Sequence, residues 1–150
     1  VVGPQLVTRL LVAGGHVTGR VHGDRQPIAH ASVALRVLEV GDREFQTGYV
    51  ESVATAPEVQ GAGHGSRVMA AIGDVLRDHF EFGALATGEH GFYERLGWER
   101  WLGPTYVLRD GERVRSPDED DAIMVLRFGT SAEVALTDPI ACRPRAGDDW

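Results

Sequence analysis

A glycine-rich segment, Gln60-Gly61-Ala62-Gly63-His64-Gly65-Ser66, has the residue types and the spacing of an anion-binding loop. It lies between an alternating apolar segment, residues 48–55, and an amphipathic segment, residues 66–80. Glycines allow a backbone to turn and to approach a ligand without Cβ clashes. A helix that begins after such a loop offers free N–H groups and its dipole to a phosphate. The order strand, glycine loop, helix therefore predicts a site for a phosphorylated cofactor.

The loop differs from two common nucleotide-binding motifs. It lacks the Gly-Lys-Ser/Thr of nucleoside-triphosphate loops. It is also a poor dinucleotide fingerprint, because Ser66 occupies the place of the third glycine and no strand ending in an acid convincingly follows the helix. Taken alone, the motif also fits a surface turn that caps a helix.

The elements around the loop follow from hydrophobic periodicity and turn residues. Strands are expected at 28–40 and 45–55, after a loosely alternating stretch at 12–22, with a turn at Gly41-Asp42. The amphipathic helix 66–80 leads to a short strand at 83–87 and a helix at 89–96 that Gly97 ends. Further expectations are a strand at 98–108 interrupted by Gly103-Pro104, a hairpin turn at Asp110-Gly111, a strand at 122–128 and an irregular tail at 129–150. This order predicts one α/β domain, residues 1–150, with a mixed sheet.

Composition and charge narrow the class of protein. The chain has 150 residues, 43% of them apolar, which suits a single globular domain with a core. It contains no apolar run long enough for a membrane span and no signal-peptide pattern, and Cys142 is its only cysteine, so we expect a cytoplasmic protein. Its six histidines are scattered and no zinc spacing occurs, so no metal site is expected. The net charge of −7 argues against nucleic acid and allows a cationic ligand.

Two motifs in the right order resemble one superfamily. Gln60-x-x-Gly63-x-Gly65 resembles the coenzyme A pyrophosphate loop of the GNAT N-acetyltransferases, and Phe92-Tyr93-x-x-x-Gly97-Trp98 resembles their Phe-Tyr-x-x-x-Gly-Phe motif. Segments 14–16, 48–54, 83–85, 115–120 and 145–150 are similar to aminoglycoside 2'-N-acetyltransferases. The resemblance implies a mostly antiparallel central sheet flanked by helices, acetyl-CoA as the acyl donor, a polycationic aminoglycoside as the acceptor, and a homodimer.

The resemblance also implies roles for individual residues. Tyr93 would be the general acid that protonates the departing thiolate, and Glu51 the general base, because a charged amine is no nucleophile. The terminal Trp150 would offer an indole and a carboxylate to the sugar pocket, and its carboxylate would be a further catalytic group that helps Glu51 to deprotonate the amine. The implied donor-binding residues, through their backbones, are Val53, Thr55, Gln60, Gly61, Ala62, Gly63, His64, Gly65 and Ser66. The implied acceptor contacts are Glu51, Ser52, Asp118, Glu119, Asp148 and Trp150.

Two departures from the family weaken the choice of substrate more than the choice of reaction. Only Val1 to Leu11 precede the first matching segment, where the family carries a strand and a helical segment with substrate-contacting acids. Ala86 stands where the family has a serine, in a segment that looks shortened. The alternatives are therefore acetylation of another small-molecule or protein amine, and a non-catalytic homologue that binds acyl-CoA or a cation.

Overall fold

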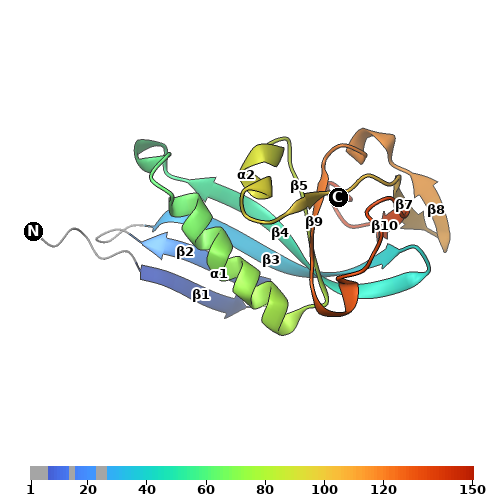
Figure 1. Ribbon diagram of the computed structural model, residues 1–150, viewed down its shortest axis with the longest axis horizontal. Helices are drawn as coiled ribbons and strands as arrows, with labels where there is room; N and C mark the ends of the chain where they lie inside the picture. The colour runs from blue at the N-terminus through green and yellow to red at the C-terminus, as the bar shows by residue number, and fades with distance from the viewer. Residues whose placement is uncertain (1–6, 14–15, 23–26) are drawn as a thin grey trace, which may run out of the picture.

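The computed structural model of the protein describes residues 7–13, 16–22 and 27–150. Within them four strands precede the first helix, and all the strands join in one sheet (Figure 1). The strands are β1 (Val7–Ala13), β2 (His16–His22), β3 (Pro27–Val40), β4 (Arg43–Thr55), β5 (Phe82–Ala86), β6 (Glu99–Arg100), β7 (Thr105–Arg109), β8 (Glu112–Arg115), β9 (Ile123–Arg127) and β10 (Ile140–Cys142). The helices are α1 (His64–His79) and α2 (His90–Glu94), with 3-10 turns η1 (Pro57–Val59), η2 (Pro117–Glu119) and η3 (Gly129–Ser131).

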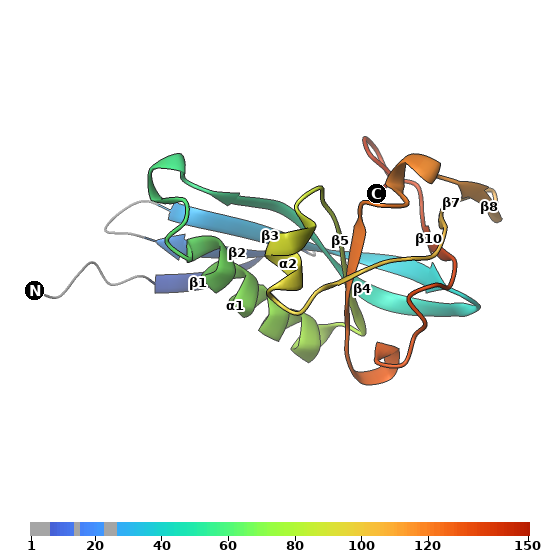
Figure 2. The same ribbon diagram turned by 45° about the horizontal axis from the view of Figure 1, so that its top comes forward.

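The long strand β3 organises the sheet. One of its edges pairs with β4, and the other is shared end to end by β2 and β10. The full order is β6-β9-β5-β4-β3-β10-β7-β8, with β1 added to β2. Two pairs are parallel, β4 with β5 and β10 with β7, and the other ladders of the described residues are antiparallel. Strands β7, β8 and β10 thus lie at the end of the molecule opposite β1 (Figures 1 and 2). The expected mixed, mostly antiparallel sheet is confirmed.

Helix α1 covers one face of the sheet across β2, β3 and β4, as its amphipathic sequence predicts (Figure 1). Its apolar stripe is buried, and each fully buried side chain of this kind contributes about 1.5–3 kcal/mol to stability. The approach is close at Gly48, where a Cβ atom would lie 2.1 Å from Cδ2 of Leu76. Gly48 therefore lets α1 lie directly against β4, the strand that leads into the glycine loop.

A second core holds the C-terminal segment against the rest of the sheet. Phe45, Phe82 and Trp101 pack together there, with ring centroids 5.6 and 6.5 Å apart along this row. The indole N–H of Trp101 donates to the Asp138 carbonyl at 3.0 Å, so the connection before β10 is fixed. Cys142 is fully buried, and burial raises the pKa of its thiol to about 11. A thiol that stays protonated at neutral pH is a structural side chain, as expected from the sequence.

The elements differ from the sequence-based expectations in three places. No element was assigned to residues 1–11 from the sequence, but Val7–Ala13 forms β1, with Ala13 opposite His16. The expected interruption of strand 98–108 at Gly103-Pro104 is confirmed, but before it only residues 99–100 are strand, and the two parts, β6 and β7, pair with different strands, β9 and β10. The tail is not wholly irregular, since residues 140–142 form β10 between β3 and β7. The expected hairpin at Asp110-Gly111 is confirmed, with φ of 51° and 80° at these residues.

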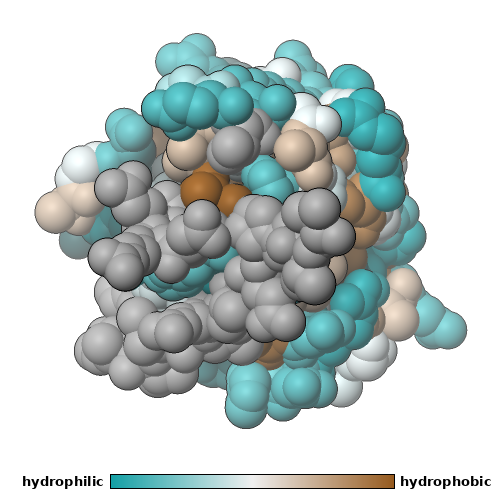
Figure 3. Space-filling view, turned by 90° about the vertical axis from the view of Figure 1, so that its left-hand side faces the viewer, coloured by the Kyte–Doolittle hydropathy of each residue, from teal (hydrophilic) through white to brown (hydrophobic). Residues whose placement is uncertain are grey.

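The end of the molecule where β1 begins is mostly hydrophilic among its described residues, with small apolar areas between them (Figure 3). In the described part of the chain, neither helix has the length and hydrophobicity to cross a membrane. The same residues contain no group of three or more His, Cys, Asp or Glu side chains that could hold a metal ion.

Candidate functional site

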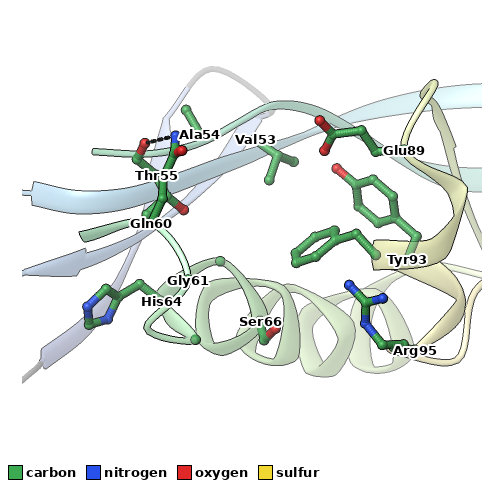
Figure 4. Close-up of a pocket in the computed structure, with 13 residues that line it drawn as sticks. Val53, Ala54, Thr55, Gln60, Gly61, His64, Ser66, Glu89, Tyr93 and Arg95 are labelled. Atoms are coloured by element: carbon green, nitrogen blue, oxygen red, sulfur yellow. Dashed lines mark hydrogen bonds between the residues drawn. The ribbon is translucent and has the colours of Figure 1, made fainter. Parts of the chain in front are cut away.

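A cavity of about 670 Å³ lies between the end of β4, the glycine loop with the start of α1, and α2 (Figure 4). Residues of all three segments point into it, and they come from positions far apart in the sequence. The lining residues are Val53, Ala54, Thr55, Gln60, Gly61, Gly63, His64, Gly65, Ser66, Glu89, Phe92, Tyr93 and Arg95. All but one of the donor-binding residues predicted from the sequence are therefore brought together, the exception being Ala62.

The cavity exists because two neighbouring strands part. Strands β4 and β5 pair only from Thr47 to Tyr49 and from Phe82 to Ala84. Beyond Tyr49, β4 continues to pair with β3 on its other edge as far as Thr55. Among the described residues, the backbone of residues 50–55 therefore has no ladder partner on the side that faces α2. An extended ligand can pair with free strand backbone of this kind.

The glycine loop presents the start of α1 to the cavity. Gly61 and Gly63 have φ of 85° and 83°, a backbone conformation that glycine adopts without strain. Gly63 is the N-cap residue, and no side chain caps this helix end. The N–H groups of the first turn have no acceptor within the helix. Gln60 braces the loop by donating from its amide nitrogen to the Thr55 carbonyl at 3.3 Å. The arrangement fits a diphosphate held by main-chain N–H groups.

A β-bulge shapes β4 just before the cavity. Two residues of β4, Ser52 and Val53, lie opposite Ala31 of β3, and Ser52 has a φ of 53°. The Ser52 carbonyl is 2.9 Å from Nδ1 of His30. Since a carbonyl oxygen only accepts, Nδ1 of His30 must carry the proton. The bulge changes the direction of the backbone between Glu51 and Val53, the two predicted reaction residues of this strand.

Tyr93 lies at the opposite wall of the cavity. Its ring packs edge-on against Phe92 and Trp98, with centroids 4.9 and 6.3 Å apart, and only 7% of the residue is exposed. Its hydroxyl points toward the Val53 side of the cavity, beside the carboxylate of Glu89 (Figure 4). Burial, and secondarily the charge of Glu89, raise the pKa of Tyr93 above its usual value. The phenol is therefore protonated at neutral pH and has a proton to donate.

Glu51 does not line the cavity, but its side chain is hydrogen-bonded to the C-terminal segment. Its Oε1 accepts a hydrogen bond of 2.7 Å from Nη1 of Arg145. Both side chains are about one-third exposed, so the pair lies at the surface of the site. Glu51 is two residues before Val53 and on the opposite side of the bulge from it, which places it close to the donor cavity. From the sequence, Glu51 was predicted to be the base with no partner named, and no role was predicted for Arg145.

A second pocket, of about 350 Å³, is built from the acidic segments and the C-terminal turn. It gathers four of the predicted acceptor-binding residues, Asp118, Glu119, Asp148 and Trp150. Trp150 is 6% exposed, packs in the second core and donates from its indole to Oγ of Ser116 at 3.1 Å. Burial first, and then the charges of Asp148 and Asp118, raise the pKa of Glu119. The three acids thus lie close enough to repel each other, and a cation between them would relieve that repulsion.

Two neighbouring acids have structural partners instead. Asp120 accepts two hydrogen bonds from Arg115, at 2.8 and 2.6 Å, which hold the pKa of Asp120 well below its usual range. Asp149 pairs with Arg109 and accepts from the backbone N–H of Arg145. These ion pairs fix the loop and the turn that present the pocket acids. Ser52, the remaining predicted acceptor contact, is exposed and lines neither pocket.

Several residues of the site were missed by sequence reasoning. Glu89, Phe92 and Arg95 line the donor cavity because they lie just before, within and just after α2, which forms one wall of it. The motif that contains Tyr93 also spans Phe92 and Arg95, but the motif alone gave neither residue a role in the cavity. Arg145 reaches Glu51 from a segment 94 positions away, and nothing in the local sequence signals that contact.

Comparisons with known proteins agree with this arrangement. Aminoglycoside 2'-N-acetyltransferase of Mycolicibacterium fortuitum is 39% identical over 127 residues, covering 82% of this chain and 65% of that protein. The Escherichia coli GNAT family N-acetyltransferase YhbS, solved in complex with CoA, has a TM-score of 0.63 at 17% identity, over 84% of this chain and 66% of that one. A GNAT family acetyltransferase of Brucella melitensis, solved with acetyl-CoA, has a TM-score of 0.55 at 17% identity, over 83% and 64%.

The chain therefore spans 65% of the length of the curated relative that it matches. The family model for the acetyltransferase (GNAT) domain matches residues 11–101, more than half of the chain, and includes the glycine loop and Tyr93. The fold, the parted strands and this match lead to the same assignment, and the chain belongs to the GNAT acetyltransferase domain family.

Proposed function

We propose that the protein transfers the acetyl group of acetyl-CoA to the 2'-amino group of an aminoglycoside. The observation that carries the proposal is the combination of two sites. A backbone-lined cavity for a phosphorylated donor ends near Glu51, and a pocket of three carboxylates for a cation is tied to Glu51 through Arg145. The name of the M. fortuitum relative supports an aminoglycoside as the acceptor.

The donor cavity has the parts that acetyl-CoA requires. Main-chain N–H groups of residues 61–66 would hold the diphosphate, and the unpaired backbone of residues 53–55 would hold the amide-bearing arm. When bound, acetyl-CoA supplies an activated acyl group as a thioester. The side chains of Phe92 and Val53 line the cavity together with Tyr93, and the ring of Phe92 packs edge-on against that of Tyr93.

The catalytic residues act by proton transfer and hydrogen bonding. Glu51 takes a proton from the acceptor ammonium, directly or through water, because only the neutral amine is nucleophilic. The N–H of Val53 stabilises the negative charge that develops during attack. The Tyr93 hydroxyl releases its proton to the sulfur of the leaving group. The chain forms no covalent bond to the acyl group in this scheme.

The acid pocket recognises the acceptor. Asp118, Glu119 and Asp148 would pair with ammonium groups, since charge-assisted hydrogen bonds are stronger than neutral ones. Trp150 lines the same pocket and would contact a sugar ring there. The cytoplasmic location and the homodimer expected from the sequence remain predictions, and the dimer would be tested by light scattering.

The direct test is release of free thiol from acetyl-CoA in the presence of paired aminoglycosides that carry either an amino or a hydroxyl group at the 2' position. We expect release with the 2'-amino member of each pair only. Equal release with both members would contradict the regiospecificity. Release with other amines alone would favour the alternative acceptor. Aminoglycoside binding by calorimetry without thiol release would favour a non-catalytic cation-binding homologue.

Replacing Glu119 with glutamine tests the acid pocket. Loss of one charge-assisted hydrogen bond should weaken aminoglycoside binding about tenfold at neutral pH. Because the pKa of Glu119 is raised, its carboxyl ionises only above the ordinary value of 4.5. Binding to the wild-type protein should therefore tighten as pH rises from 4.5 toward neutrality, and Glu119→Gln should flatten that dependence. Calorimetry measures both effects.

The matched control is Glu112→Gln, which makes the same change at an exposed position on β8 outside the pocket. This variant should bind aminoglycosides with wild-type affinity at every pH. Equal weakening by the two variants would mean that only overall charge matters and would remove Glu119 from the binding site.

A further inference from the structure

We infer that Arg145 is a positioning residue for the reaction, one that orients the carboxylate of Glu51 and couples it to the acid pocket. The inference rests on the proposed function, in which Glu51 is the general base. Three observations support it. Arg145 binds only one of the two carboxylate oxygens of Glu51, Arg145 is itself held in place by other residues, and its charge is positive.

The contact leaves half of the carboxylate available. Nη1 of Arg145 donates to Oε1 of Glu51 at 2.7 Å, and this is the hydrogen bond that holds the carboxylate. Within the described part of the chain, Oε2 of Glu51 has no hydrogen-bond partner. A bidentate pair would occupy both oxygens. The monodentate pair instead fixes the side chain by one oxygen and leaves the other to take a proton from the acceptor.

Arg145 is itself held from several sides. Its Nε donates to the Asp148 carbonyl at 2.8 Å, and its backbone N–H donates to Oδ1 of Asp149 at 3.2 Å. Its guanidinium carbon lies 5.2 Å from the ring centroid of Tyr49, a residue that is only 2% exposed. An exposed ion pair between two flexible chains is worth little, because it must be ordered first. Here the arginine is ordered by the turn and by the Tyr49 ring, so it can hold Glu51 in one orientation.

The buried ring of Tyr49 provides a stable base for this contact. Arg36 of β3 also lies over Tyr49, with its guanidinium carbon 4.8 Å from the centroid, and donates to the Arg143 carbonyl at 2.8 Å. Burial raises the pKa of Tyr49 far above its usual value, so the phenol stays neutral. The C-terminal segment is thereby tied to the sheet on both sides of Arg145, through Arg143, which accepts from Arg36, and through Asp149, which pairs with Arg109 of β7.

The positive charge of Arg145 allows a role in orienting Glu51 to be distinguished from a role in binding the acceptor. A fixed cation beside a pocket for a polycation repels the acceptor, so Arg145 opposes ground-state binding. Its contribution must then lie in the chemical step, where a misplacement of about 1 Å can cost about 100-fold in rate. Loss of Arg145 should therefore lower kcat without raising the aminoglycoside KM. A purely structural role would predict the opposite, because a loosened turn would displace Asp148 and raise KM.

The experiment compares Arg145→Met, which keeps the length and removes the charge, with Arg145→Lys and with Arg143→Met. We expect Arg145→Met to lower kcat by up to about 100-fold, with an unchanged or lower aminoglycoside KM. Arg145→Lys should stay within a few-fold of wild type, because a monodentate contact needs one N–H donor. Arg143 pairs with exposed Glu44 at 3.5 Å on the surface, and Arg143→Met should behave as wild type.

A double-mutant cycle shows whether Arg145 acts through Glu51. In a Glu51→Gln background, Arg145→Met should cause no further loss of kcat, since the group that it orients is already inactive. The same fold-loss in both backgrounds, or a raised KM with unchanged kcat, would overturn the inference. Wild-type turnover by Glu51→Gln alone would instead overturn the assignment of the base.

A crystal structure of Arg145→Met tests the orientation without any turnover. The Glu51 side chain should occupy several rotamers or turn away from its wild-type position, while residues 146–150 keep their fold. An unchanged, well-ordered Glu51 would contradict the inference. This result is independent of the proposed function, which fails if the wild-type protein releases no thiol with any 2'-amino aminoglycoside, or releases as much with the 2'-hydroxyl members.

Discussion

Replacing Tyr93 with phenylalanine is expected to lower the turnover number by about 10²–10⁴-fold, the range that general acid catalysis supplies. The change removes one hydroxyl and keeps the ring that packs edge-on against Phe92 and Trp98. Folding and acetyl-CoA binding should therefore be preserved. Thiol release measures the turnover, and calorimetry with acetyl-CoA measures the binding.

The pH profile adds a second check on Tyr93. Burial raises the pKa of Tyr93 above its usual value of 10.0, so the phenol keeps its proton across neutral and mildly alkaline pH. Below pH 10, the wild-type kcat should not fall through deprotonation of Tyr93. An alkaline decline attributable to the general acid should begin only above that value and vanish in Tyr93→Phe. Turnover of Tyr93→Phe equal to wild type at all pH values would exclude the residue from the mechanism.

Glu51→Gln should have an effect of the same order, about 10²–10⁴-fold on kcat, because the acceptor amine would lose its base. Glutamine keeps the shape and can still accept a hydrogen bond from Arg145, so the C-terminal turn should stay in place. The matched control is Glu44→Gln, which lies on the same strand and whose exposed side chain pairs at 3.5 Å with Arg143. That control should keep wild-type turnover.

Glu89 is a carboxylate that lies beside Tyr93, and it allows a sharp contrast with Glu51. If Glu51 is the base, Glu89→Gln should change kcat far less than Glu51→Gln, since its charge acts on Tyr93 only as a secondary influence. The reverse order, with an active Glu51→Gln and an inactive Glu89→Gln, would transfer the base to Glu89. Thiol release at saturating acetyl-CoA distinguishes the two cases.

Features with a local physical cause could be predicted from the sequence. The apolar period of residues 66–80 predicted α1, and Asp110-Gly111 predicted a hairpin because such residues adopt positive φ readily. The glycine loop was predictable for the same reason. Its position at the end of a strand and the start of a helix then located the donor cavity, because the backbone itself provides that site.

Features with a distant cause could not be predicted in this way. Strand β10 has three residues, too few for an alternating pattern, and forms because β3 and β7 lie on either side of it. Strand β1 depends on pairing with β2. The contact between Glu51 and Arg145 joins residues that are 94 positions apart in the sequence. Its existence depends on the whole topology rather than on any segment.

The place of β10 in the sheet also determines the order in which the molecule can be assembled during synthesis. Strands β7 and β8 are made before β10, yet in the described ladders β10 is what connects them to β3. A nascent chain can therefore form the strands and helices around the donor cavity before β10, the strand that pairs with β7 of the β7–β8 hairpin, has been made. Because synthesis runs from the N-terminus, the segment that completes the proposed acceptor pocket, which includes Asp148 and Trp150, is the last part of the pocket to become available.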